Sequence, residues 1–141
     1  MARSADTSCP SIALVGFGEA GLVFASAAQW EGSARGWDIL AERRALMEAA
    51  GVEASPGPAE ALADAELVLS LVTADAAPRA AAEDASFLRE CAIWCDMNSV
   101  APQTKQQAAR AIGEHGGLYV DVAVMAPVDP AALSVPLLIS G

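Results

Sequence analysis

Short apolar runs alternate along this chain with segments whose apolar positions recur at helical spacing. Continuous apolar runs are typical of strands that are buried on both faces of a sheet. They predict strands at residues 12–15, 37–41, 52–54, 66–72, 92–96, 118–124 and 136–140. The intervening segments predict helices at residues 20–29, 42–50, 55–65, 75–89 and 102–115.

Strand and helix therefore alternate strictly, and the connections are too long for hairpins. Such a series predicts a doubly wound α/β fold, in which a mainly parallel sheet is covered by helices on both faces. The length of 141 residues suits one domain. We assign residues 11–141 to that domain and residues 1–10, which are mostly polar, to a flexible N-terminal tail.

A glycine-rich segment, GFGEAG, stands between the first predicted strand and the first predicted helix. This position is typical of a turn that binds the pyrophosphate of a dinucleotide. Gly16 permits the tight turn, Gly18 lets the pyrophosphate approach the backbone, and Gly21 lets helix and sheet pack closely. The alternative is that these glycines only shape a turn. The predicted cofactor-binding residues here are Gly16, Phe17, Gly18, Glu19, Ala20 and Gly21.

The end of the second strand is where such folds contact the adenosine ribose. Glu42 stands there in our prediction, 21 residues after Gly21, and a carboxylate at this place pairs with the ribose hydroxyls of NAD. Arg43 follows at once, and an arginine can instead hold the 2′-phosphate of NADP. Both Glu42 and Arg43 are predicted to bind cofactor, and the choice between NAD and NADP stays open. A charged helix start is the alternative for Glu42.

Composition narrows the possible partners. The net charge of −10, with only eight basic residues, argues against nucleic-acid binding. Backbone amides must therefore do most of the work of holding a phosphate. No apolar run approaches the roughly 18 residues of a membrane span. Cys9, Cys91 and Cys95 have no zinc-site spacing, so we predict no metal and expect reduced thiols in a cytoplasmic protein.

Four segments together point to a family. VGFGEAGLVFA, LVLSLVTADAA, DMNSVAPQT and YVDVAVMAP occur in the order and spacing seen in the β-hydroxyacid dehydrogenase and 6-phosphogluconate dehydrogenase superfamily. The chain resembles the N-terminal NAD(P)-binding domain of that family over residues 11–141. The resemblance implies a Rossmann fold, NAD or NADP as cofactor, and hydride transfer to or from a small hydroxy acid as the parent chemistry.

The resemblance also implies roles for residues outside the glycine segment. The loop after the fourth strand and the segment after the fifth would lie by the nicotinamide, and the segment 121–127 would contribute to the substrate pocket. Thr73 and Ser99 could instead cap the helices that follow them, and Asp121 could be structural. The implied residues are Val72, Thr73 and Asn98 for cofactor, and Ser99, Val124 and Met125 for substrate.

The chain departs from the family in two respects. Met125 replaces the family's usual serine, which argues against ordinary 3-hydroxy acids as substrates. We also expect the helical C-terminal domain that carries the family's catalytic lysine to be absent. We therefore predict no catalytic residue, and Lys105, the only lysine, is not assigned to catalysis.

Two functions remain open. The chain is either the cofactor half of a dehydrogenase or a free-standing dinucleotide-binding module without turnover. Apolar surface left beside residues 135–139 predicts a homo-oligomer that forms through this region. The alternative is a monomer in which residues 136–140 fold back onto the sheet.

Overall fold

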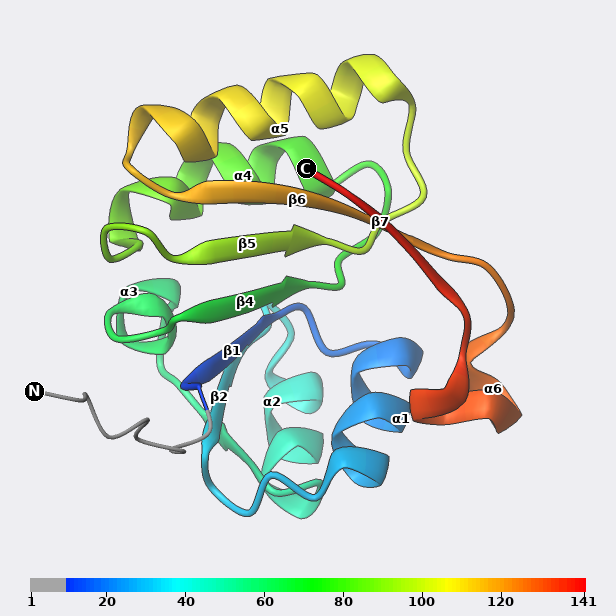
Figure 1. Cartoon of the computed structure of the whole chain (residues 1–141). Coiled ribbons are helices and arrows are strands. Elements are labelled where there is room, and N and C mark those ends of the chain that lie inside the picture. Colours follow the sequence, from blue (N-terminus) through cyan, green and yellow to red (C-terminus); the bar gives the residue numbers. More distant parts are fainter. Residues whose placement is uncertain (1–9) are drawn as a thin grey trace, which may run out of the picture.

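The computed structural model describes residues 10–141 and shows one sheet with helices packed on both of its faces (Figure 1). Residues 1–9 of the predicted N-terminal tail, which include Cys9, lie outside the described residues.

The sheet has seven strands in the order β3-β2-β1-β4-β5-β6-β7. The first six strands are parallel, and β7 runs antiparallel to β6. The strand order reverses between β1 and β4, and ligands of such sheets bind at the carboxyl ends of the strands at this reversal. The strands are β1 (Ile12–Val15), β2 (Ala34–Trp37), β3 (Val52–Ala54), β4 (Leu67–Ser70), β5 (Ile93–Asp96), β6 (Leu118–Val124) and β7 (Leu137–Ser140).

The helices divide between the two faces because neighbouring residues of a strand point to opposite sides. Ala13 and Val15 of β1 belong to a core cluster with residues of α3, α4 and α5, whereas Leu14 packs with residues of α1 and α2. The predicted doubly wound fold is therefore confirmed. The helices are α1 (Glu19–Ala28), α2 (Ala41–Ala49), α3 (Pro58–Leu62), α4 (Ala77–Asp84), α5 (Pro102–Glu114) and α6 (Val128–Ala131), with 3₁₀ turns η1 (Ala85–Phe87) and η2 (Ala132–Ser134).

The predicted boundaries of the second strand are wrong. The strand is Ala34–Trp37 instead of 37–41, and Ile39 and Leu40, which the prediction placed inside it, are 72% and 50% exposed. The inward positions of β2 are occupied by Ala34 and Gly36, which produce no apolar run. Position 36 requires glycine because a Cβ there would lie 2.8 Å from the sulfur of Met47.

Other differences are confined to the ends of elements and to two short added elements. The fourth helix ends at Asp84 and continues as the 3₁₀ turn η1, so it is shorter than predicted. The short segments α6 and η2 lie between β6 and β7, where the sequence analysis expected no helix.

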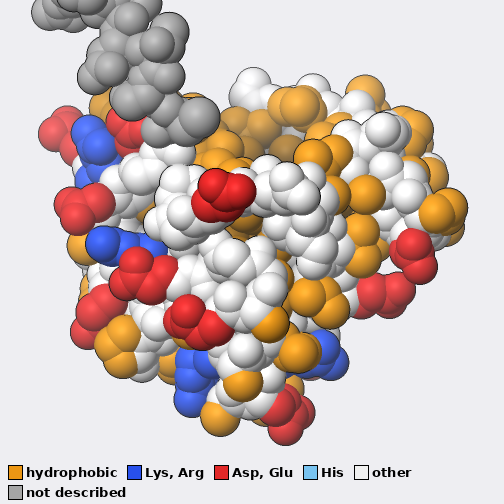
Figure 2. Space-filling model, turned by 90° about the horizontal axis from the view of Figure 1, so that it is seen from below, with side chains coloured by type: hydrophobic (Ala, Val, Ile, Leu, Met, Phe, Trp, Pro, Cys, Tyr) orange, Lys and Arg blue, Asp and Glu red, His pale blue; other side chains and the backbone are white. Residues whose placement is uncertain are grey.

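Charged and hydrophobic side chains gather on different sides of the surface. Figure 2 shows charged side chains over the left of the view and hydrophobic side chains gathered on the right, the side where Figure 1 places α6 and β7. Leu133, Leu138 and Ile139 are each about three-fifths exposed there. Within the described part of the chain, no helix is long and apolar enough to cross a membrane.

Candidate functional site

The chain turns sharply after β1, and this turn requires glycine at position 16. Gly16 has a φ of +86°, a conformation that side chains disfavour. A Cβ at this position would also lie 2.6 Å from the carbonyl oxygen of Leu71 in the neighbouring segment. The Gly16 N–H donates to the carbonyl of Trp37 at 2.8 Å. The turn is thus held against the ends of both adjacent strands.

Gly18 occupies the opposite kind of environment. It is the N-cap of α1, makes no side-chain capping bond, and has nothing within 4 Å of the place where a Cβ would stand. The first N–H groups of a helix have no partner within the helix, and the helix dipole favours an anion beside them. Open space in front of an uncapped helix N-terminus is the geometry that receives a phosphate.

The other residues of the glycine segment either pack against the turn in the interior or lie beside it on the surface. Phe17 is fully buried, and a Cβ at Gly21 would lie 3.1 Å from its ring, so close packing of α1 on the turn depends on that glycine. Glu19 is exposed in the first turn of α1.

Asp38, which the sequence analysis missed, follows directly after β2. Its carboxylate accepts hydrogen bonds from the N–H of Phe17 at 2.7 Å and from the N–H of Leu40 at 2.8 Å. It therefore ties the glycine turn to the end of β2. Glu42, predicted for this place, lies one helical turn further on, exposed at the start of α2.

The two arginines after Glu42 differ in their contacts. Arg44 donates to the carbonyl oxygens of Asp38 and Ile39, and its guanidinium lies 5.1 Å from the centre of the Trp37 ring. These contacts brace the loop between β2 and α2. Arg43 makes no such contact with the described residues and lines the cavity described next.

A cavity of about 590 Å³ opens at the carboxyl ends of β1, β2 and β4, within the size range of small-molecule sites. It brings together the glycine turn, the loop after β2, the loop after β4 and one side of α4. Of the predicted cofactor residues it is lined by Gly16, Gly18, Glu19, Ala20, Arg43, Val72 and Thr73.

The capping alternatives for Thr73 and Ser99 are wrong. The N-cap residues of α4 and α5 are Ala76 and Ala101, and neither helix has a side-chain cap. Two backbone N–H groups, those of Ala76 and Ala77, donate instead to the carbonyl oxygen of Thr73. Neither hydroxyl group therefore caps its helix, and that of Thr73 hydrogen-bonds the carboxylate of Asp75 instead.

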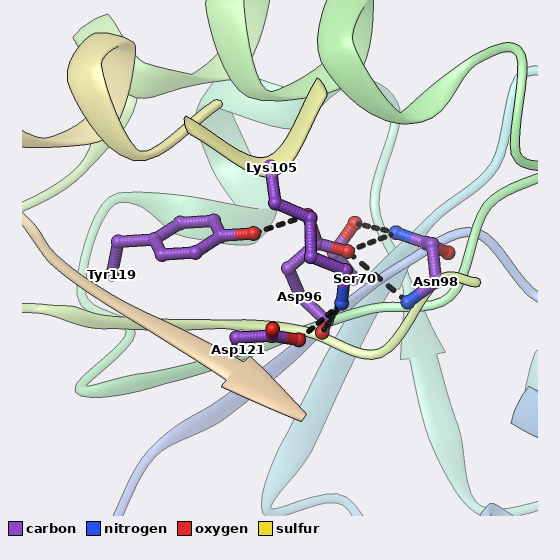
Figure 3. Close-up of polar contacts among 6 residues, drawn as sticks. All are labelled: Ser70, Asp96, Asn98, Lys105, Tyr119 and Asp121. Carbon is purple, nitrogen blue, oxygen red and sulfur yellow. Dashed lines mark hydrogen bonds and ion pairs between the residues drawn. The ribbon is translucent and has the colours of Figure 1, made fainter. Parts of the chain in front are cut away.

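A buried polar network lies beside this cavity, at the ends of β4 and β5 and along the first half of β6 (Figure 3). Asp96 accepts hydrogen bonds from the hydroxyl of Tyr119 at 2.7 Å and from both the backbone and side-chain nitrogens of Asn98. The Asn98 side-chain nitrogen also donates to the hydroxyl of Ser70 at 3.2 Å. Both donor bonds of the amide fix its orientation, and its oxygen is left free to accept. Burial, followed by the hydrogen bond to Asp96, raises the pKa of Tyr119, so its phenol remains a donor.

Lys105 closes the network from α5. Its ammonium group is paired with Asp121 and lies 3.4 Å from the carbonyl oxygen of Asp96. The side chain of Asp121 is 38% exposed, whereas that of Lys105 is 13% exposed. The pair therefore has a structural part in joining α5 to β6.

The residues predicted to contact substrate lie at the same edge of the sheet but outside the cavity. Val124 ends β6, Met125 is 61% exposed, and the N–H of Met125 donates to the carbonyl of Pro136 at 2.9 Å. Ser99 is exposed after β5. Among residues 10–141, no group of histidine, cysteine and acidic side chains could hold a metal ion.

A doubly wound sheet with a glycine turn at the first helix, and a carboxylate after the second strand, defines a Rossmann-type dinucleotide-binding domain. Residues 11–139 match the family described as the NAD binding domain of 6-phosphogluconate dehydrogenase. The chain belongs to this family. It is thus an NAD-binding domain of the kind found in 6-phosphogluconate dehydrogenase.

Solved structures agree with this assignment. A conserved hypothetical protein from Sinorhizobium meliloti is similar with 36% identity and a TM-score of 0.88, over 96% of this chain and 48% of that chain. The 3-hydroxyisobutyrate dehydrogenase of Mycobacterium tuberculosis has 22% identity and a TM-score of 0.86, over 95% and 47%. A Myxococcus stipitatus imine reductase variant in complex with NAD+ has 20% identity and a TM-score of 0.79, over 95% and 47%.

The last two likenesses show a shared fold. The chain spans about half the length of each of these three structures. The comparison with curated protein sequences gives no match.

Proposed function

We propose that this chain binds NAD(H) through the cavity at the carboxyl ends of β1, β2 and β4. The observation that carries the proposal is the open space at Gly18, in front of the uncapped N-terminus of α1. A pyrophosphate placed there accepts hydrogen bonds from backbone N–H groups, which explains how a chain with a net charge of −10 holds an anion.

The carboxylate of Asp38 supports NAD over NADP. It lies at the end of β2, where a carboxylate pairs with the ribose 2′-hydroxyl and repels a 2′-phosphate. Both of its oxygens are held by backbone N–H groups, so its position is set before the cofactor arrives. Arg44 is engaged with the loop carbonyls, and Arg43 alone of the two lines the cavity.

The bound nicotinamide would supply hydride transfer, and the protein would orient it. Asn98 is the residue we assign to the nicotinamide end, because the network around Asp96 directs its amide and leaves its oxygen as an acceptor. Val72 and Thr73 would border the same end. Ser99, Val124 and Met125 are proposed to face the substrate.

We propose a small hydroxy acid as substrate class for the oxidoreductase to which such a domain contributes. Met125 is apolar and cannot donate a hydrogen bond to a substrate carboxylate, which argues against ordinary 3-hydroxy acids. The second candidate is a dinucleotide-binding module without turnover, and it is supported by the absence of an assignable general base among residues 10–141. An assay of hydride transfer to NAD+ separates the two candidate functions. The purified 141-residue chain is mixed with each of a panel of hydroxy acids, and the formation of NADH is monitored by its absorbance.

The binding proposal is tested by calorimetric titration of the purified chain with NAD+ and with NADP+. We expect NAD+ to bind more tightly, and Gly18→Val to abolish binding, because the added side chain fills the space needed by the pyrophosphate. Gly113→Val is the matched control, since Gly113 also has open space around it but lies on α5, outside the cavity. Unchanged affinity in a folded Gly18→Val protein would contradict the proposed phosphate site, and tighter binding of NADP+ would contradict the role of Asp38.

A further inference from the structure

Asp84, the last residue of α4, is a buried acid with no assigned task. It is 5% exposed and lines the same cavity as the glycine turn. Among residues 10–141, its carboxyl group forms no hydrogen bond or ion pair, and only burial and the charge of Glu83 perturb it. Its oxygens are nevertheless not sealed from solvent, and the residue lines the cavity. The carboxyl group can therefore bond a group that the cavity receives.

The protonation of Asp84 determines what it can bind. Burial, and to a smaller extent the neighbouring Glu83, raises the pKa of Asp84 from 3.8 to about 7. The protonated carboxyl group offers one O–H donor and one acceptor side by side, whereas the ionised group only accepts. Five other charged side chains line this cavity, namely Glu19, Asp38, Arg43, Arg79 and Glu83.

The order of groups along the cavity indicates which part of a dinucleotide reaches Asp84. The pyrophosphate belongs at Gly18 and the adenosine ribose at Asp38. The base is attached to the far side of that ribose and therefore extends towards α4. The cavity is lined by Trp37 and, at intervals of four residues along α4, by Ala76, Ala80 and Asp84. Apolar walls suit the faces of a flat base, and Asp84 is the buried polar group available to its edge.

We propose that the carboxyl group of Asp84 hydrogen-bonds the amino edge of the adenine base and makes this domain selective for adenine dinucleotides. This inference rests on the proposed dinucleotide binding. Adenine presents an N6 amino donor beside the N7 acceptor, whereas a 6-oxopurine presents two acceptors on that edge. An ionised carboxylate accepts a hydrogen bond from the amino group and repels the 6-oxo group.

The probe is nicotinamide hypoxanthine dinucleotide, in which a 6-oxo group replaces the amino group of adenine and N1 carries a hydrogen. Titrations are made by calorimetry at about pH 8.5, where Asp84 is ionised. We expect the wild-type chain to prefer NAD+ by about tenfold, the loss expected when a hydrogen bond to a charged group is replaced by a repulsive contact. In Asp84→Asn the preference should fall below about threefold, because a side-chain amide can turn to present either a donor or an acceptor.

Asp64→Asn is the matched control. It removes an exposed carboxylate that lies outside the cavity and should keep the preference for NAD+. A merely structural role of Asp84 would weaken both dinucleotides equally in Asp84→Asn and leave their ratio unchanged. That result, or equal binding of both probes by the wild-type chain, would overturn the assignment of Asp84 while leaving dinucleotide binding intact. Failure of the folded wild-type chain to bind NAD+ would overturn both proposals.

Discussion

Replacing Asp84 by asparagine should change how the stability of the domain depends on pH, whether or not a ligand is present. The folded state raises the pKa of Asp84 from 3.8 to about 7. Between these values the unfolded chain has released a proton that the folded chain retains, so stability falls as the pH rises. The loss begins near the unfolded pKa and is complete above the folded pKa.

The magnitude follows from the two pKa values. They differ by about three, and each pH unit corresponds to about 1.36 kcal/mol, so the carboxyl group costs up to about 4 kcal/mol at alkaline pH. Water in the cavity stabilises the ionised form, so we expect a measured loss of between about 1 and 4 kcal/mol. Asparagine has a similar shape and does not titrate. The free energy of unfolding of Asp84→Asn relative to wild type should therefore rise by this amount between about pH 4 and pH 8.

The assay is urea denaturation followed by circular dichroism at several pH values, with the difference between the two proteins as the measured quantity. Asp64→Asn is the matched control, because Asp64 is an exposed aspartate outside the cavity. A difference between wild type and Asp84→Asn that stays constant across this pH range would refute the reasoning. It would mean that the carboxyl group is as well solvated in the folded chain as in the unfolded one.

Three further substitutions test other parts of the structure. Gly16→Ala should destabilise the fold by about 2 kcal/mol or more, because of its positive φ and the contact with the Leu71 carbonyl; wild-type stability in urea denaturation would contradict the turn geometry. Tyr119→Phe should cost about 1–2 kcal/mol by removing a donor from buried Asp96, and no loss in the same assay would show that water replaces the hydroxyl. Leu138, 64% exposed on β7, should contribute to a homodimer interface at micromolar concentration; light scattering should show a dimer that Leu138→Asp dissociates, and a monomeric wild-type chain would disprove it.

Much of the architecture could be predicted because the central strands are buried on both faces. Such strands are continuous apolar runs, as in Ile12–Val15, and the glycine turn is local, so its sequence and its structure coincide. The strand β2 could not be found in this way. Its inward residues are small to accommodate Met47, and the apolar pair that follows, Ile39 and Leu40, is exposed.

The error in β2 determined the error at the site. A strand placed too late made Glu42 the first acid after it, whereas the strand ends at Trp37 and Asp38 follows. An acid that directly follows a tryptophan near the expected spacing was a signal that sequence reasoning could have used.

The polar network and the burial of Asp84 could not be predicted from the sequence for a different reason. Ser70, Asp96, Lys105 and Tyr119 belong to four different elements that only the tertiary fold brings together. Asp84 stands next to Glu83 in an alanine-rich segment, and nothing in the local sequence tells which of the two acids is buried. Its burial depends on how α4 packs over the cavity, which no local spacing encodes.

The bond between Asp38 and the N–H of Phe17 has a consequence for redesigning cofactor preference. Replacing the acid after β2 by an apolar residue is a direct route towards a phosphorylated cofactor, since it removes the repulsion of the extra phosphate. Here that change would also remove the acceptor of the Phe17 N–H in the glycine turn, and it would make the proposed phosphate site less rigid. Asparagine or serine at position 38 would keep an acceptor for that donor without the negative charge. A successful exchange of coenzyme in this domain therefore has to preserve the turn while it alters the charge.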